Sequence, residues 1–371
     1  MEDLSIIIDG RPLTTYPLGK PGFHAGTETF VIQLAKGLAE RGHTVHTLTP
    51  DLDHEEQRGT TEWWWGPENH PRYADVVIGV FALSHLGDLV APLLVMAPNG
   101  IDPPLYDYKD QVDAYACFTQ AHADLMVKRM RIDPWACHIT GLGVIPPSYR
   151  RDTIHREYGR MLWANDPTRG LWHCLDIYDA VRKQVPEASL VVSYGFDQQF
   201  KAQEWRATAL AEVMWECKRR LATTPGVESM GQLTELQMVK QQMQTHVHAM
   251  PSDPQNVGSQ LHGLTQLELA AAGVPLVLSD IEAFPEIFGG VAEILPLPGM
   301  MRKATGNDMV RVDAQDWADV VVSIMKDTKK WRAMSKAGRE LAEKHTWAAV
   351  IDRWETLLQT LLAQLRAKAA A

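Results

Sequence analysis

The sequence predicts an α/β protein built from two doubly wound, Rossmann-like domains, and three observations lead to this fold class. The chain has 371 residues, enough for two domains of ordinary size, and its apolar content of 45% is that of a globular protein. Its first fifty residues follow the order strand, glycine-bearing loop, helix and strand of a βαβ unit. A proline pair and a charged run, 146–160, then separate this half from a second half with the same alternation.

The first βαβ unit opens with a buried strand at 4–9 and closes with a strand at 44–48. Between them, a long loop rich in proline and glycine leads to Gly26 and Thr27, and apolar residues at helical spacing follow. In a parallel sheet this loop lies at the carboxyl edge of the strands, where ligands bind. Its length favours a functional loop over a plain connection.

The rest of the first half predicts strands at 75–80, 93–97 and 114–118 and helices at 84–90 and 122–131. Trp63, Trp64 and Trp65 precede them. In a strand Trp64 faces opposite to its neighbours, so we expect at least one indole to be partly exposed. Such an indole suits stacking on a sugar or base, and packing under a loop is the alternative. The acidic triplet 51–53 is interpreted as a solvated loop without a metal.

The second half begins with a strand at 161–164, a turn through Arg169 and a helix at 172–184. An arginine at a strand-to-helix turn is placed to grip a diphosphate, whereas capping of Asp166 is the alternative. A strand near 188–194, a helix at 198–221, a strand at 227–230, a helix at 233–245 and a strand at 246–250 follow. His246 and His248 alternate on that last strand, but without a third ligand they are interpreted as satisfied sheet histidines.

The most informative stretch runs from 250 to 285. A polar loop leads into a buried helix that Gly273 and Pro275 end, and an apolar strand follows at 274–278. The helix N-terminus, expected near Ser259 and Gln260, offers free N–H groups to a phosphate. Glu268 lies roughly 12 Å further along the helix, about the distance from a diphosphate to the ribose of one nucleotide. The alternative for Glu268 is a half-buried carboxylate capped by an arginine.

The end of the chain predicts a strand at 290–295 and helices at 313–327 and 329–344. A terminal amphipathic helix follows, and we expect it to pack on the protein, with membrane binding as the alternative. The cysteines form no CxxC pair, the first residues are interpreted as a strand and not as a signal peptide, and no transmembrane helix is expected. The formal charge of −10 argues against a surface that tracks nucleic acid throughout, though it allows one basic groove. We therefore expect a cytoplasmic protein, or one peripheral to the membrane.

Three segments carry a resemblance to a known family. They are Gly263-Leu264 with Glu268-Leu-Ala-Ala-Ala-Gly-Val-Pro275, the turn Asn165-Asp-Pro-Thr-Arg-Gly-Leu171, and Gly141-Leu-Gly-Val-Ile-Pro-Pro147. Together they resemble the retaining glycosyltransferases of the GT-B fold, of the family-four (group 1) type. Two positions depart from that family, because Gln260 stands where an acidic residue is usual and His262 where phenylalanine is usual.

The resemblance implies two Rossmann-like domains facing a cleft, 1–148 for the acceptor and 149–345 for the nucleotide-sugar, with 346–371 as a helix that crosses back to the first. It implies that Glu268 binds the donor ribose and that Arg169 stabilises the leaving diphosphate. Gln260 or Ser259 would contact the sugar, and His85, less clearly Asn99, is a further candidate. The remaining implied donor-binding residues are Gly26, Thr27, Leu261, Gly263, Leu264 and Thr265.

By the same resemblance the protein is a hexosyltransferase that moves a sugar from a nucleotide-sugar, a UDP- or GDP-sugar, to a glycan or lipid-linked glycan with retention and without a metal. Two alternatives stay open. One is a phage-type enzyme that glycosylates a hydroxymethylated DNA base, with the Trp63–Trp65 run and the basic clusters at 128–131, 150–151 and 218–220 lining a groove. The other is a non-catalytic protein that binds sugar nucleotides, which the glutamine at position 260 suggests.

Overall fold

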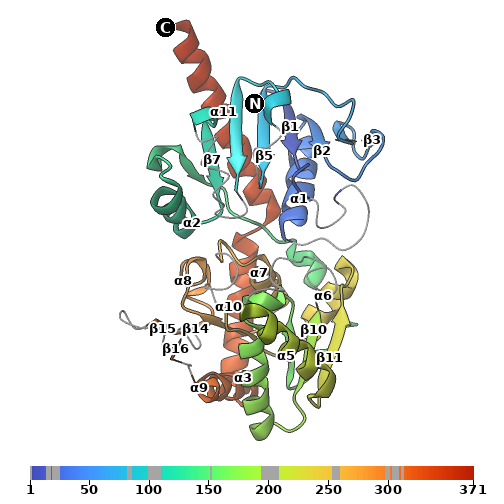
Figure 1. The fold of residues 1–371 in the computed structure, drawn as a ribbon, viewed down its shortest axis with the longest axis vertical. Coiled ribbons are helices and arrows are strands. Elements are labelled where there is room, and N and C mark those ends of the chain that lie inside the picture. The colour runs from blue at the N-terminus through green and yellow to red at the C-terminus, as the bar shows by residue number, and fades with distance from the viewer. Residues whose placement is uncertain are drawn as a thin grey trace. The chain divides into compact units, whose positions relative to one another are not determined.

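A computed structural model describes residues 2–13, 18, 26–81, 86–98, 110–150, 153–193, 209–252, 260–296, 301–302, 309–310 and 313–371. The chain divides into two compact units (Figure 1). The first unit consists of Met1–Gly143 together with His345–Ala371, and the second consists of Val144–Lys344. The last segment of the chain therefore belongs to the same unit as the first.

One eight-stranded sheet forms the centre of the first unit, with the strand order β3-β4-β2-β1-β5-β6-β7-β8. All neighbouring strands are parallel except β3 and β4, which are antiparallel. The central strands are buried on both faces, which explains their unbroken apolar runs. The strands are β1 Ser5–Asp9, β2 Thr44–Leu48, β3 Glu56–Gln57, β4 Glu62–Trp65, β5 Val76–Val80, β6 Leu93–Ala97, β7 Ala114–Cys117 and β8 Cys137–Ile139.

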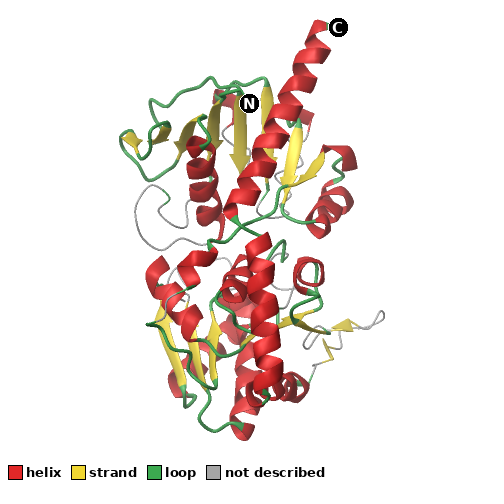
Figure 2. Cartoon of the chain, turned by 180° about the vertical axis from the view of Figure 1, so that it is seen from behind, coloured by secondary structure: helices red, strands yellow, loops and turns green. Residues whose placement is uncertain are grey.

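Two long helices of this unit pack together, α1 (Gly26–Glu40) and α11 (Trp347–Ala370). Figure 2 shows both in front of the strands of the first unit. The Phe30 and Trp354 rings lie 6.0 Å apart, and Arg353 Nε donates to the carbonyl of Thr140 at 2.7 Å. The terminal amphipathic helix therefore returns to the first unit, as predicted. The shorter helices are η1 Leu86–Asp88, α2 Gln120–Leu125, η3 Met126–Met130 and η4 Pro134–Ala136.

Two short motifs of the first unit are the tryptophan run at 63–65 and the acidic triplet at 51–53. Trp64 is fully buried, while Trp63 and Trp65 are half-buried, which confirms the predicted alternation. In the acidic triplet, Asp51 accepts a hydrogen bond from the Leu18 backbone N–H at 3.1 Å, and it also binds a neighbouring threonine hydroxyl. Asp51 thus holds a turn, which agrees with the interpretation of this triplet as an ordinary loop.

The second unit contains two parallel three-stranded sheets, β11-β10-β9 and β12-β13-β14. They meet where His246 N donates to Arg160 O at 2.8 Å and where His248 Nδ1 lies 2.8 Å from Leu162 O. The six strands therefore follow the order β11-β10-β9-β12-β13-β14, which is doubly wound with its switch point between β9 and β12. The strands are β9 Arg160–Trp163, β10 Ser189–Ser193, β11 Val227–Gly231, β12 His248–Met250, β13 Leu276–Ser279 and β14 Glu293–Leu295.

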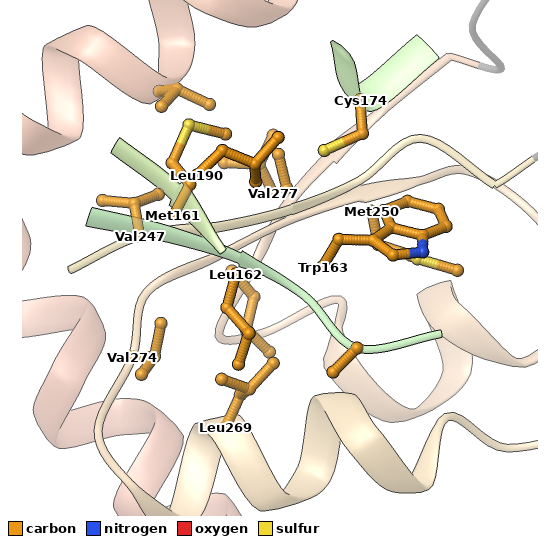
Figure 3. Packing of buried hydrophobic residues seen from close by; sticks show 14 of the residues in the cluster. Met161, Leu162, Trp163, Cys174, Leu190, Val247, Met250, Leu269, Val274 and Val277 are labelled. Atoms are coloured by element: carbon orange, nitrogen blue, oxygen red, sulfur yellow. The ribbon is translucent and has the colours of Figure 1, made fainter. Parts of the chain in front are cut away.

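The core of the second unit lies between these strands and their helices. Figure 3 shows Leu162 of β9 pointing toward Leu269, with Met161 on the opposite side of the strand. This packing seats the helix that carries Glu268 directly on the sheet. The helices are η5 Pro146–Tyr149, η6 Pro167–Arg169, α3 Leu171–Gln184, α5 Ala209–Thr223, α6 Glu235–Gln244, α7 Leu264–Ala271, α8 Ala283–Phe288, α9 Ala314–Lys326 and α10 Thr328–Lys344, and β15 Met301–Arg302 pairs with β16 Met309–Val310.

The start of α7 differs from the prediction. The helix begins at Leu264, not near Gln260, because Gly263 adopts a left-handed conformation with φ of 97°. A Cβ at this position would lie only 2.8 Å from the Phe284 ring. The predicted helix end is confirmed, since Gly273 has φ of 73° and its N–H donates to Ala270 O at 2.8 Å. Two other predicted helices, 84–90 and 198–221, fall partly on residues outside those described.

Candidate active site

The carboxyl edge of the second sheet brings together residues from its two central strands. The turn after β9 carries Arg169, and the chain leaving β12 carries Ser252. Near the ends of these strands, Asn165 Nδ2 lies 3.3 Å from Met250 Sδ, so the two chain segments are in direct contact. Ligands of doubly wound proteins bind outside the carboxyl ends of the strands, at this kind of switch point.

Arg169 lies at the end of η6, in a turn whose hydrogen bonds do not involve the Arg169 side chain. The Asp166 carboxylate accepts hydrogen bonds from the Thr168 backbone N–H at 2.8 Å and from the Thr168 hydroxyl. The left-handed Gly170, with φ of 118°, then starts α3. Among the described residues, the half-buried Arg169 guanidinium makes no hydrogen bond or ion pair. Thr168 therefore supplies hydrogen bonds to Asp166. Burial raises the pKa of this carboxyl group, and Arg169 acts on it in the opposite direction only through its charge. The guanidinium N–H groups remain available to an anion.

Gln260 is held firmly in front of α7. Its side chain is buried and its Nε2 donates to the Ser252 hydroxyl at 2.9 Å. Its backbone N–H donates to the Glu282 carboxylate, and its carbonyl accepts from Ala283 N at 3.3 Å. The Gln260 N–H is thus already used, so the helix-end phosphate site that the sequence placed at this residue is wrong. The free N–H groups of α7 begin after Gly263 instead.

Glu268 lies one turn into α7, roughly 6 Å along the helix from Leu264, so the spacing of roughly 12 Å that followed from a helix start near Gln260 is not found. The residue is half-buried, and its Oε2 accepts a hydrogen bond from Gln242 Nε2 at 2.7 Å. Burial raises the pKa of Glu268 to about 7, although the hydrogen bond from Gln242 acts in the opposite direction. Its partner is therefore a neutral amide and not the arginine of the alternative interpretation. A carboxylate left without a countercharge is suited to accept hydrogen bonds from ligand hydroxyls.

Two residues near Glu268 did not emerge from the sequence. Gln242 is fully buried on α6, and its Oε1 has no partner among the described residues. Tyr149 is buried, and its pKa is raised by burial and by the charges of Glu268 and Glu235. A signal for Gln242 existed, because a helix beginning at the capping box of Thr234 places this glutamine among buried apolar positions.

The other predicted site residues are distributed as follows. Gly26 and Thr27 form the first turn of α1, in the first unit. Leu261 is buried, and Leu264 and Thr265 are half-buried in the segment that enters α7. The candidates Ser259, His85 and Asn99 lie outside the described residues. No site residue of the first unit is therefore tested.

The two histidines of the second sheet have separate structural partners. His246 accepts a hydrogen bond from Gly159 N at 3.2 Å and stacks on Trp331. His248 is fully buried, and burial lowers its pKa to about 4. In the described part of the chain, no three His, Cys, Asp or Glu residues are arranged to hold a metal ion, and no helix there is long and apolar enough to cross a membrane.

Comparison with known proteins gives relatives for nearly the whole chain. No family model matches the sequence. The phosphatidyl-myo-inositol mannosyltransferases of Mycobacterium tuberculosis and Mycobacterium bovis are 21% identical, over 93% of this chain and 95% of theirs. Similar solved structures include a sucrose-phosphate synthase from Thermosynechococcus elongatus, with a TM-score of 0.72, 15% identity and coverage of 97% of this chain and 99% of that one.

Two further structures have the same fold. WaaG, a glycosyltransferase involved in lipopolysaccharide biosynthesis, gives a TM-score of 0.66 at 10% identity, over 95% of this chain and 99% of its own. HepE of Anabaena, solved with UDP-glucose, gives 0.67 at 13% identity, over 95% and 99%. At such identity the structures establish the GT-B fold, and the mycobacterial enzymes add a sequence match along almost the full length. This chain therefore has the GT-B fold, and its sequence is similar to that of the mycobacterial mannosyltransferases along almost its full length.

Proposed function

We propose that this protein transfers a sugar from a UDP- or GDP-sugar to a hydroxyl of a glycan or lipid-linked glycan, without a metal ion. One observation carries the proposal: Glu268, held by Gln242 and lacking a countercharge, lies one turn inside the helix that begins beside the switch point of the second sheet. Such a carboxylate fits the paired hydroxyls of a ribose. The names of the relatives support the reactant classes, because the mycobacterial enzymes are named for a phosphatidylinositol and the Anabaena protein binds UDP-glucose.

In this proposal, the diphosphate binds between Arg169 and the free N–H groups at the start of α7. Negative charge builds on the departing diphosphate during transfer, and a guanidinium with a helix N-terminus stabilises that charge. The departing phosphate accepts the proton of the acceptor hydroxyl on the same face of the sugar, which gives retention without a carboxylate nucleophile. Gln260 or Ser259 contacts the sugar, with His85 as a further candidate for this contact, while Gly26 and Thr27 serve the donor phosphate and the acceptor.

The first test is nucleotide binding. Melting temperatures are measured with UDP, GDP, ADP and TDP and their common sugar conjugates, for the natural protein and for Glu268→Ala. A rise for one base that is lost in the variant supports the site and identifies the donor class. If no nucleotide raises the melting temperature, the proposed donor site is wrong.

The non-catalytic alternative is separated by turnover. The selected donor is incubated with candidate acceptors, and release of the nucleoside diphosphate and transfer of the sugar are followed by mass. Binding of the donor without transfer to any acceptor and without slow donor hydrolysis would favour a binding protein. Transfer that disappears in Glu268→Ala, with the fold retained, rules the binding protein out.

For the DNA alternative, the described residues give no specific support. Arg219 is paired with Glu216 at 2.6 Å, and Arg220 is paired with Asp176 and Asp179 at 2.7 and 2.8 Å. Ion-paired arginines are less available to a phosphate backbone. Incubation of hydroxymethylated DNA with nucleotide-sugars tests this alternative directly. An increase in the mass of the DNA would show that DNA, and not a glycan, is the acceptor.

A further inference from the structure

The second unit has a pocket of about 400 Å³ that none of the proposed catalytic residues lines. It lies over α10 and the end of η5, beside the C-terminal end of α7, whereas the candidate active site is at the N-terminal end of that helix. Its volume is in the range of pockets that bind small organic ligands. Four of its lining residues are cations: Arg150, Arg332, Lys336 and Arg339.

These cations exceed the carboxylates around them. Glu343 pairs with Arg150, and Glu340 lies 3.7 Å from Lys336. For Arg332 and Arg339, no carboxylate lies within ion-pairing distance among the residues that the structure describes. Two guanidinium groups at the pocket are therefore not neutralised by the protein's own acids.

A fifth cation adds to the excess. Arg156 Cζ lies 5.1 Å from the centre of the Trp331 ring, and Trp331 lines the pocket. Arg156 Nη2 and Arg339 Nη2 donate to the same carbonyl oxygen, that of Ala272, at 2.6 and 3.0 Å. This close approach of Arg339 needs Gly273, because a Cβ there would lie 2.4 Å from Arg339 Nε.

Burial and mutual repulsion lower the pKa of two of these guanidinium groups. Burial, and then the charge of Arg339, lower the pKa of Arg156 to about 10. Burial and the charge of Arg150 lower the pKa of Arg339. The carboxyl end of a helix supplies only about half a negative charge, so the end of α7 compensates these guanidinium groups in part. An anion in the pocket would relieve the remaining repulsion.

We propose that this pocket is a second anion site, which binds the phosphate group of a phosphomonoester or phosphodiester. A phosphate offers several acceptor oxygens to diverging N–H donors, and guanidinium groups bind it in bidentate fashion. Arg332 and Lys336 are exposed at the rim, and the partly buried Arg339 lies deeper. The same chemistry is offered by a phospholipid headgroup at a bilayer surface and by a soluble phosphate ester.

The test uses the full chain and separates these two sources. Binding of inorganic phosphate and glycerol 3-phosphate is measured by calorimetry, and binding to vesicles is measured by sedimentation with phosphatidylglycerol or phosphatidylcholine. The test variant carries Arg332→Gln and Lys336→Gln, two exposed changes on α10. The matched control carries Lys218→Gln and Arg219→Gln, two exposed changes of equal charge on α5.

We expect the α10 variant to weaken binding at least tenfold with an unchanged melting temperature, and the α5 variant to bind like the natural protein. Vesicle binding that requires phosphatidylglycerol identifies a headgroup, and binding of glycerol 3-phosphate alone identifies a soluble ester. Phosphate binding at the candidate active site is distinguished by Arg169→Gln, which should abolish binding there and leave binding at the pocket unchanged. Equal weakening by both double variants, or no binding by the natural protein, would overturn the proposal and leave the proposed glycosyltransferase site untouched.

Discussion

Replacement of Glu268 by glutamine gives a sharp test because stability and binding are expected to change in opposite directions. The change keeps the size of the side chain and an acceptor for Gln242 Nε2, which now lies 2.7 Å from Glu268 Oε2. It removes a charge that the folded protein accommodates poorly, since burial raises the pKa of Glu268 from 4.5 to about 7. A purely structural residue would lose stability on the same replacement.

The sign and size follow from the raised pKa. Below pH 4.5 the carboxyl is protonated in both the folded and the unfolded chain, so it has no net effect there. As the pH rises to 7, the unfolded chain ionises first, and the folded protein loses roughly 3 kcal/mol of relative stability at 1.36 kcal/mol per pH unit. Contact of the half-buried Glu268 with water reduces this to about 1–2 kcal/mol.

At pH 8, the free energy of unfolding of Glu268→Gln should therefore be about 1–2 kcal/mol larger than that of the natural protein. This difference should vanish toward pH 4.5. Its affinity for the selected nucleoside diphosphate should fall by about 1.5–3 kcal/mol, the usual worth of a hydrogen bond to a charged group. Denaturant unfolding at several pH values and calorimetry measure the two quantities. The control is Glu187→Gln, an exposed glutamate for which neither should change. A less stable variant at pH 8, or an unchanged affinity, would refute this reasoning.

Three further replacements test the surroundings of the site and the fold. Gln242→Leu removes the donor to Glu268, so nucleotide affinity should fall and unfolding should become easier by about 1–3 kcal/mol; unchanged calorimetric affinity would contradict the positioning role. Gly263→Ala forces a Cβ to within 2.8 Å of Phe284 at φ of 97°, and denaturant unfolding should show a loss of about 1–3 kcal/mol. Trp354→Ala empties the contact of α11 with the first unit and should cost about 3–5 kcal/mol in the same assay, whereas a loss below 1 kcal/mol would mean that α11 is dispensable.

Patterns that depend on neighbouring residues were predictable from the sequence. The apolar strands, the alternation of Trp63 to Trp65, and the end of α7 at Gly273 all follow from local periodicity or from the conformational freedom of glycine. The return of α11 to the first unit came only from the family resemblance, because an amphipathic face does not specify its partner.

Features that depend on tertiary contacts were not predictable. The sequence placed the start of α7 near Gln260, but the left-handed Gly263 and the bond from Gln260 N to Glu282 exclude a helix there. The partner of Glu268 lies on another helix, 26 residues away, and although helical spacing from Thr234 could place Gln242 on a buried face, it could not show which side chain Gln242 contacts. Likewise, the sequence could not show that Thr168 supplies hydrogen bonds to Asp166.

The contacts of Arg156 suggest how the fold keeps the Glu268 carboxylate in place despite its unfavourable burial. One guanidinium nitrogen donates to Thr245 O, at the end of α6, and the other donates to Ala272 O, at the end of α7. These are the two helices whose side chains meet in the hydrogen bond between Gln242 and Glu268. Arg156 thus ties α6 and α7 together at their carboxyl ends, and the distance between the amide and the carboxylate is set by the backbone as well as by the side chains. In the proposed donor site, this bracing would hold the two helices together and limit the access of water to a carboxylate that has no countercharge.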